Sequence, residues 1–287
     1  MKTYLVPVDF SDTSRLALEY ALDLAIKTEA RVLAIHVYEV AAVLPGFAEV
    51  MMQETLRETE KEMSAFLSGI DHRGASLSTI VREGGVVGEI SKAIKELNIS
   101  LVIMGTGGGK NLAKKLFGTT TEAVAKKGLC PVLVIPEGAV IKPIEHIVYA
   151  ADLENGDELT VLQLLQFKKL FNASITFLHI ENDKQPNYIP NEYIKENLQQ
   201  LYPEAGLRFI EIKQKEVAEG ISDFVQAHET SLLAFTIINR HLVDRIGHTS
   251  VTSRLLHNLK LPMLALPENG ILLDIRQREI SGEEKSV

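Results

Sequence analysis

The stretch that decides the fold begins at Leu101, reads LVIMGTGGGKN as far as Asn111, and continues as FGTTT at residues 117–121. Its first four residues are apolar without alternation, which is typical of a parallel strand that helices cover on both faces. Glycines stand where that strand ends, and Gly118 opens the next helical pattern. Because glycine-loop and helix-start amides can point at one anion, this pattern predicts a phosphate-binding loop. The same glycines would also suit a plain turn between a strand and a helix.

This pattern differs from two common nucleotide loops. A P-loop needs a Gly-Lys-Ser or Gly-Lys-Thr run, and the sequence contains neither. A Rossmann fingerprint belongs after the first strand of a domain, whereas these glycines follow a later one. The stretch therefore indicates another kind of phosphate site.

The chain contains two similar halves. Residues 4–39 match residues 147–182 at an offset of 143, which pairs Asp9 with Asp152 and His36 with His179. Residues 88–137 match residues 219–268 at an offset of 131. The first half therefore holds about twelve extra residues, which we expect between residues 40 and 75. The chain is a duplicated domain rather than a short-period solenoid.

Short β-branched runs alternate with helical patterns in each half, which predicts an α/β fold with doubly wound parallel sheets. The strands predicted in the first half are Thr3–Val8, Arg31–Tyr38, Leu77–Val81, Leu101–Met104 and Val132–Ile135. We expect one domain over residues 1–140, a second over residues 141–270 and a charged tail over residues 271–287.

Composition excludes several classes of protein. The 287 residues are 46% hydrophobic and 24% charged, which excludes wholesale disorder. One cysteine excludes an internal disulfide framework and fits a reducing compartment. The net charge of −8 argues against a nucleic-acid partner. No apolar run is long enough for a membrane helix or a signal peptide, so we expect a cytoplasmic protein with no membrane partner.

Three motifs together resemble the ATP-binding universal stress proteins. They are the opening run from Val6 to Ser11, the glycine spacing from Gly105 to Thr119, and the closing run from Cys130 to Pro136. The resemblance covers nearly the whole chain as two tandem domains. It implies in each domain an open, mostly parallel five-stranded sheet of order 3-2-1-4-5 with helices on both faces. The nucleotide would lie at the carboxyl ends of strands 1 and 4, which agrees with the switch-point rule.

The resemblance also implies roles for individual residues. Asp9 would contact the adenosine part of the ligand, although a carboxylate there would also cap the next helix. Val37 would present main-chain groups to adenine, and the loop glycines would cradle the phosphates. Gly107 departs from the family, which often has a bulkier polar residue there. The predicted nucleotide-binding residues are Pro7, Val8, Asp9, Val37, Met104, Gly105, Thr106, Gly108, Gly109, Lys110, Asn111, Gly118, Thr119 and Thr120.

The second half departs further from the motif. Thr236, Asn239 and Thr249 stand where the first half has Gly105, Gly108 and Gly118, and only Ser250 keeps the hydroxyl of Thr119. Side chains there would crowd the phosphates and disfavour positive φ. We expect this half to keep the fold and to have lost the ATP loop. No histidine spacing matches a zinc site, so no metal site is predicted.

Three structural expectations concern other residue types. Cys130 precedes an apolar strand, which favours a buried thiol over a nucleophile. Met51, Met52 and Met63 lie in one charged helical pattern, which indicates a packing or partner face. His36 and His179 occupy equivalent strand positions, which suggests a shared structural role.

These observations predict a stress-response sensor or regulatory binding module. Its ligand would be an adenine nucleotide, either ATP or AMP or ADP, with Mg²⁺ as a further candidate. The order of residues singles out no general base, so we expect nucleotide hydrolysis to be slow or absent. The alternatives are an ATP-using enzyme, a nucleotide-independent scaffold, and a small-metabolite binder in the second half. Because members of that family usually dimerise through their last strand, the resemblance also implies that Val132–Ile135 pairs with Met263–Leu266 in an intramolecular pseudo-dimer. A homodimer and protein partners of unknown identity are also expected.

Overall fold

The structure is a computed structural model, and it describes residues 2–39, 48–106, 119–140, 142–151, 158–181, 191–237 and 259–268. The strands are β1 (Thr3–Pro7), β2 (Arg31–Tyr38), β3 (Ser76–Glu83), β4 (Leu101–Thr106), β5 (Val132–Pro136), β6 (His146–Ala150), β7 (Ser174–Glu181), β8 (Arg208–Lys213), β9 (Leu232–Ile237) and β10 (Met263–Pro267). The helices are α1 (Asp12–Thr28), α2 (Ala48–Ser68), α3 (Val86–Glu96), α4 (Thr119–Lys126), α5 (Glu158–Phe171), α6 (Asn191–Leu201) and α7 (Val217–Ala227), with a 3₁₀ turn η1 (Pro203–Ala205).

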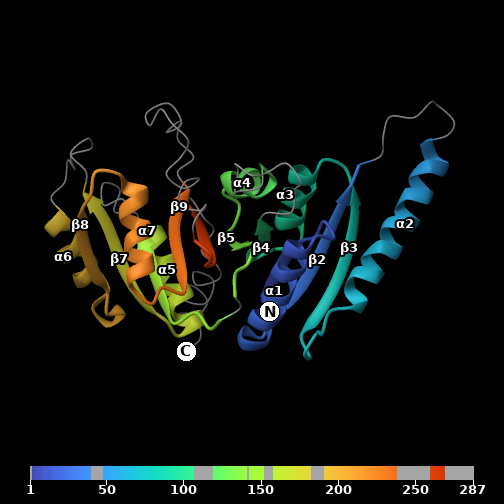
Figure 1. The fold of residues 1–287 in the computed structure, drawn as a ribbon. Helices are drawn as coiled ribbons and strands as arrows, with labels where there is room; N and C mark the ends of the chain where they lie inside the picture. Colours follow the sequence, from blue (N-terminus) through green and yellow to red (C-terminus); the bar gives the residue numbers. More distant parts are fainter. Residues whose placement is uncertain are drawn as a thin grey trace, which may run out of the picture.

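All ten strands form one sheet, in the order β3-β2-β1-β4-β5-β10-β9-β6-β7-β8. Each half therefore has the predicted order 3-2-1-4-5, and the strands within each half are parallel. Figure 1 shows the halves side by side, with β8 and α6 at one outer edge and β3 and α2 at the other. The prediction of two tandem, doubly wound α/β domains is confirmed.

The halves join through an antiparallel pair of strands, β5 and β10. Leu264 lies opposite Leu133, and Ala265 lies opposite Val132. This is the predicted pairing of Val132–Ile135 with Met263–Leu266, formed within one chain. Both strands are fully buried, so the pairing covers two sheet edges that would otherwise be open to association.

Helices cover both faces of the sheet, and each face carries one continuous core. On one face α1, α2, α5 and α6 contribute buried side chains, among them Leu18, Phe66, Leu164 and Leu198. On the other face α3, α4 and α7 contribute Ile90, Val124 and Phe224, among others. Since both cores run through both halves, the junction at β5 and β10 is packed like the interior of a domain.

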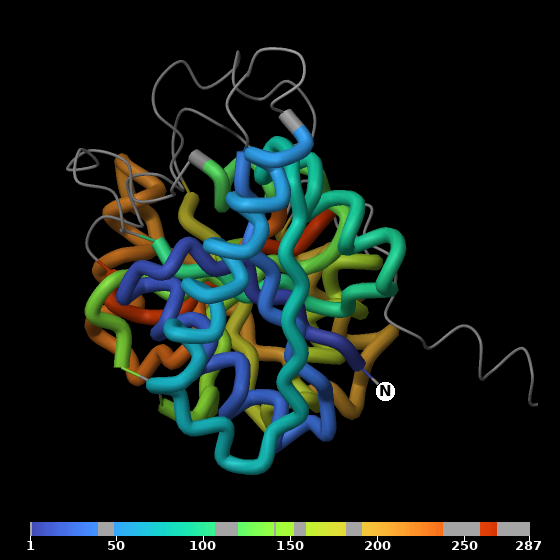
Figure 2. Tube along the Cα trace, turned by 90° about the vertical axis from the view of Figure 1, so that its right-hand side faces the viewer, coloured from blue at the N-terminus to red at the C-terminus, as the bar shows by residue number. Residues whose placement is uncertain are grey.

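The extra residues of the first half lie in its second helix. α2 has 21 residues and α6 has 11, so most of the predicted difference of about twelve falls there. Figure 2, viewed from the β3 edge, shows α2 running alongside that strand. Met63 is buried against the sheet, whereas Met51 and Met52 are exposed near the start of the helix. The methionine pattern is therefore a packing face only in part.

Three further expectations meet the structure. His36 Nδ1 lies 2.7 Å from the carbonyl oxygen of Val8, and His179 Nδ1 lies 3.1 Å from that of Ala151. The shared role of the two histidines is thus to tie the second strand of each half to the chain after the first strand. Cys130 is buried, as predicted. Among the described residues, no helix is long and apolar enough to cross a membrane.

Candidate functional site

The candidate site lies at the carboxyl ends of β1 and β4. The chain leaves β1 through α1, which packs on one face of the sheet, and α4 follows β4 on the opposite face. Neighbouring parallel strands whose connections leave on opposite faces form a crevice between their carboxyl ends. The strand order therefore places the predicted site at a ligand crevice before any side chain is considered.

Asp9 follows β1 and is exposed at this edge. Its Oδ1 accepts hydrogen bonds from the Ser11 hydroxyl at 2.5 Å and from the Ser11 amide at 3.2 Å. Ser11 is also the N-cap of α1, because its hydroxyl oxygen accepts the Ser14 amide hydrogen at 3.2 Å. The cap of α1 is thus Ser11, and Asp9 holds the capping residue rather than the helix itself.

These hydrogen bonds keep the Asp9 carboxyl ionised. Partial burial raises the pKa of this group, but the Ser11 hydroxyl, the Ser11 amide and the Ser14 side chain outweigh it. The pKa of Asp9 therefore lies below its usual range. At neutral pH the group is a charged acceptor at the mouth of the crevice, suited to the hydroxyls of a ligand.

Phe10 is a site residue that the sequence did not reveal. Its φ of 63° lies in the left-handed region, which is unusual for a bulky residue. The ring stacks on the His36 imidazole with centroids 4.3 Å apart, and its edge meets Phe66 at 5.6 Å. His36 is itself held by the Val8 carbonyl. This stack fixes the direction in which the chain turns after Asp9.

Gly105, in β4, is a glycine because α1 passes directly over it. A Cβ there would lie 2.3 Å from the carbonyl oxygen of Thr13 and 2.5 Å from its carbonyl carbon. Its φ is not in the left-handed region, so at this position the expected need for positive φ is wrong. The first glycine of the motif therefore serves the packing of α1 on β4.

The other described members of the predicted set lie around the same edge. Val8, Met104 and Thr106 are buried. Pro7, Val37 and Thr120 are half-buried. The structure thus brings β1, β2 and β4 together as predicted. Gly108, Gly109, Lys110, Asn111 and Gly118 lie outside the described residues, as does the side chain of Thr119.

Comparison with known proteins matches the same half of the chain. The sequence profile of the universal stress protein family matches residues 1–136. The universal stress protein MJ0531 of Methanocaldococcus jannaschii is 31% identical over 138 residues, which make up 47% of this chain and 81% of that protein. The chain belongs to the universal stress protein family.

Other members of the universal stress protein family show how far the likeness extends. YxiE of Bacillus subtilis is 30% identical over 142 residues, or 46% of this chain and 96% of that protein. The crystal structure of a universal stress protein from Archaeoglobus fulgidus DSM 4304 gives a TM-score of 0.73 at 17% identity. It covers 93% of this chain and 98% of that chain. The sequence likeness therefore covers about half of the chain, whereas the fold is shared across both halves.

The second half of this universal stress protein has a different structure at the position of Gly105. Thr236 stands there, and its hydroxyl lies 2.8 Å from the hydroxyl of Tyr149 on β6. Thr236 is therefore held by a side-chain hydrogen bond that a glycine at this position could not form. Asp152, Asn239, Thr249 and Ser250 lie outside the described residues.

Another acidic group at the carboxyl edge of the sheet, Glu89 in the first turn of α3, is already engaged in this universal stress protein. Glu89 pairs with Lys92 at 2.6 Å and with Arg82 at 3.7 Å. The hydrogen bond from Lys92, more than any other interaction, lowers the pKa of Glu89. Within the described ranges, no group of three or more histidine, cysteine or acidic side chains could hold a metal ion.

Proposed function

We propose that the first half binds an adenine nucleotide, ATP, AMP or ADP, in the crevice between β1 and β4. The observation that carries the proposal is the ionised, exposed Asp9 at the switch point between β1 and β4; in the sequence, β4 continues into the glycine-rich stretch. A fixed carboxylate can accept hydrogen bonds from ribose hydroxyls, and glycine-loop amides can hold phosphates. The resemblance of the motif to the ATP-binding universal stress proteins supports ATP as the first ligand to test, with Mg²⁺.

We infer that nucleotide hydrolysis is slow or absent, so that the protein acts as a regulatory binding module in a stress response. A general base needs a pKa near the working pH. The Asp9 and Glu89 carboxyls both have lowered pKa values, and both accept hydrogen bonds from neighbouring side chains. Nucleotide-dependent binding to a protein partner, with the β5–β10 pseudo-dimer as the unit, is the mechanism that fits this chemistry.

The test is titration calorimetry with ATP and Mg²⁺ after removal of co-purified nucleotide. Asp9→Asn keeps the shape of the side chain but removes its charge, and we expect affinity to fall by about 10- to 100-fold, as for a charge-assisted hydrogen bond. Asp12→Asn is the matched control, because Asp12 is exposed three residues further on and carries the same charge. We expect that control to change affinity less than about twofold.

The outcomes separate the alternatives. One site per chain that is weakened by Asp9→Asn alone supports the proposal, as does the absence of phosphate release over hours. Equal weakening by both variants would mean that only the local charge matters. No binding to stripped wild-type protein would overturn the nucleotide proposal and favour a nucleotide-independent scaffold.

A further inference from the structure

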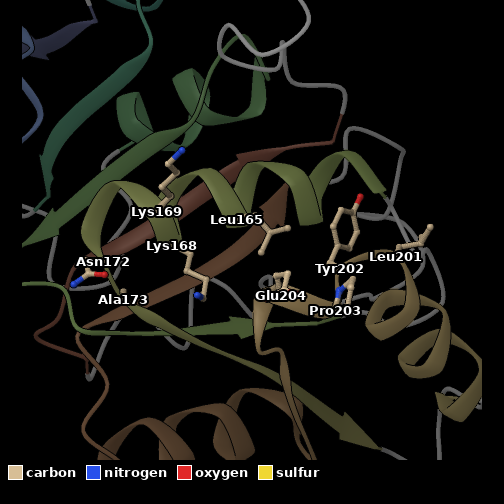
Figure 3. Close-up of a pocket in the computed structure, with 10 residues that line it drawn as sticks. Leu165, Lys168, Lys169, Asn172, Ala173, Leu201, Tyr202, Pro203 and Glu204 are labelled. Atoms are coloured by element: carbon tan, nitrogen blue, oxygen red, sulfur yellow. The ribbon is translucent and has the colours of Figure 1, made fainter. Parts of the chain in front are cut away.

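A hollow lies in the second half of the chain, at the amino ends of the strands of that half. It has a volume of about 570 Å³, and it is bounded by the C-terminal turns of α5 and α6 and by η1. The residues around it are Leu165, Lys168, Lys169, Asn172, Ala173, Leu201, Tyr202, Pro203, Glu204 and Ala205. Figure 3 shows Leu165 on α5, with Tyr202, Pro203 and Glu204 opposite. Its volume is in the range of small-molecule pockets.

Comparison of the halves explains why this hollow exists. α1 and α5 end in the same way, with Glu29 and Asn172 as equivalent left-handed residues (φ 51° and 53°). Glu29 and Asn172 are 143 positions apart. At this offset Leu165 corresponds to Leu22, and Lys168 corresponds to Ala25. In the first half those two positions are 1% exposed, in the core, whereas Leu165 and Lys168 are half-buried.

The second helix of each half accounts for the difference. α2 is long and buries Phe66, and the chain just after it buries Ile70, in the core that contains Leu22 and Ala25. The shorter α6 stops at Leu201, which is 52% exposed, and the chain then turns through η1. Surface that is covered in the first half is therefore open in the second, and a lysine stands in place of a core alanine.

The charge of Lys168 has no counterpart among the described residues. Neither Lys168 nor Lys169 forms an ion pair with them, and Glu204, the one acid around the hollow, forms none either. Both lysines stabilise the C-terminus of α5 through the helix dipole, which explains a cation there but not a half-buried one. In Figure 3 Lys168 leaves α5 on the side of Pro203 and Glu204, whereas Lys169 leaves it on the opposite side.

We propose that this hollow binds a small amphipathic carboxylate, such as a medium-chain fatty acid. The carboxylate would pair with Lys168, and the hydrocarbon chain would pack against Leu165, Leu201 and the Tyr202 ring. Apolar walls with one half-buried cation suit a monoanion with an apolar tail, since a polyphosphate needs several cations or amides. The hollow involves none of the residues predicted to bind nucleotide, so this inference is independent of the proposed function.

The test compares decanoate with decanol, which share a chain and differ in charge, by titration calorimetry below the micelle concentration. We expect wild-type protein to bind decanoate about 3- to 10-fold more tightly than decanol, as for a partly exposed ion pair. Lys168→Ala, which installs the residue of the first half, should remove that preference and leave decanol affinity unchanged. Lys169→Ala is the matched control and should keep the preference.

Hydrogen exchange locates the ligand independently. Decanoate should slow amide exchange in residues 165–173 and 201–205. The urea midpoint of Lys168→Ala should stay close to that of the wild type, because the higher helix propensity of alanine offsets the lost interaction of Lys168 with the helix dipole. Equal affinity for decanol and decanoate, equal effects of the two lysine variants, or protection elsewhere would each overturn the proposal. So would the absence of saturable decanoate binding.

Discussion

Replacing Gly105 by alanine tests whether this motif glycine is needed for packing rather than for a ligand. The added Cβ would lie 2.3 Å from the Thr13 carbonyl oxygen, about 1 Å short of the 3.4 Å at which ordinary contact begins. The Cβ is fixed to the backbone of β4, and the Thr13 carbonyl is part of the backbone of α1, so neither can rotate away. The start of α1 must therefore move off β4. Overpacking of this kind costs about 2 to 3 kcal/mol.

We expect Gly105→Ala to lower the free energy of unfolding by that amount and the melting temperature by roughly 4 to 10 °C. The measurement is urea and thermal unfolding of ligand-free protein. Gly88→Ala is the control, because Gly88 lies in α3 with no atom within 4 Å of the added Cβ. That change should stabilise the protein by about 0.5 to 1 kcal/mol.

A Gly105→Ala protein as stable as the wild type would refute the close approach and return Gly105 to a role in ligand binding. The expected result has a practical consequence for the nucleotide proposal. A bulkier residue at Gly105 would abolish binding by displacing α1, and with it Ser11 and Asp9, whether or not a phosphate ever contacts Gly105. Asp9→Asn is therefore the sharper test of the site.

The remaining predictions concern three side chains. Phe10→Ala and Phe10→Gly both lose the stack on His36, but only glycine adopts the left-handed backbone without strain. Phe10→Gly should therefore be about 1 kcal/mol more stable than Phe10→Ala in urea unfolding. The reverse order would contradict the strain at Phe10. Burial raises the pKa of the Cys130 thiol to about 12, so a thiol-exchange reagent at pH 8 should react only as fast as the protein opens. Reaction within seconds in the native state would show that the thiol is accessible. Because folding lowers the pKa of Asp9, its contribution to stability is complete above the usual value of 3.8 and disappears as the pH falls through the lowered one. The difference in unfolding midpoint between wild type and Asp9→Asn should therefore shrink from pH 5 to pH 3, and a constant difference would count against the lowered pKa.

The alternation of strand and helix patterns and the two constant offsets predicted two similar α/β halves, and the resemblance to the universal stress proteins supplied the strand order. Tyr4 pairs with Leu101 as Ile147 pairs with Leu232, which is the relation that the offsets require. The pairing of Val132–Ile135 with Met263–Leu266 was predicted from the family resemblance instead, and the structure adds its antiparallel direction, with Leu133 opposite Leu264. Such relations are visible in sequence because duplicated strands keep their apolar pattern wherever the sheet is buried.

The local geometry of the site was less accessible. Phenylalanine disfavours the left-handed backbone, so nothing in the run around Asp9 indicated that Phe10 adopts it. The contact between Gly105 and Thr13 joins residues about ninety positions apart, and it depends on how α1 crosses β4. The hollow beside Lys168 was also missed, because it depends on the lengths of α2 and α6 rather than on any motif.

The two halves show why a glycine motif and a nucleotide site should be argued separately. At the end of β4 the backbone of α1 occupies the space that a side chain would need, so Gly105 is constrained before any ligand binds. At the end of β9 the equivalent Thr236 uses that position for a hydrogen bond to Tyr149. Replacing Thr236 by glycine would remove that bond, and Asn239 and Thr249 would still stand where the first half has Gly108 and Gly118, so one substitution would not restore the motif of the first half. Gly105 and Thr236 are therefore each constrained by their own contacts, so neither residue by itself is evidence for or against a phosphate site.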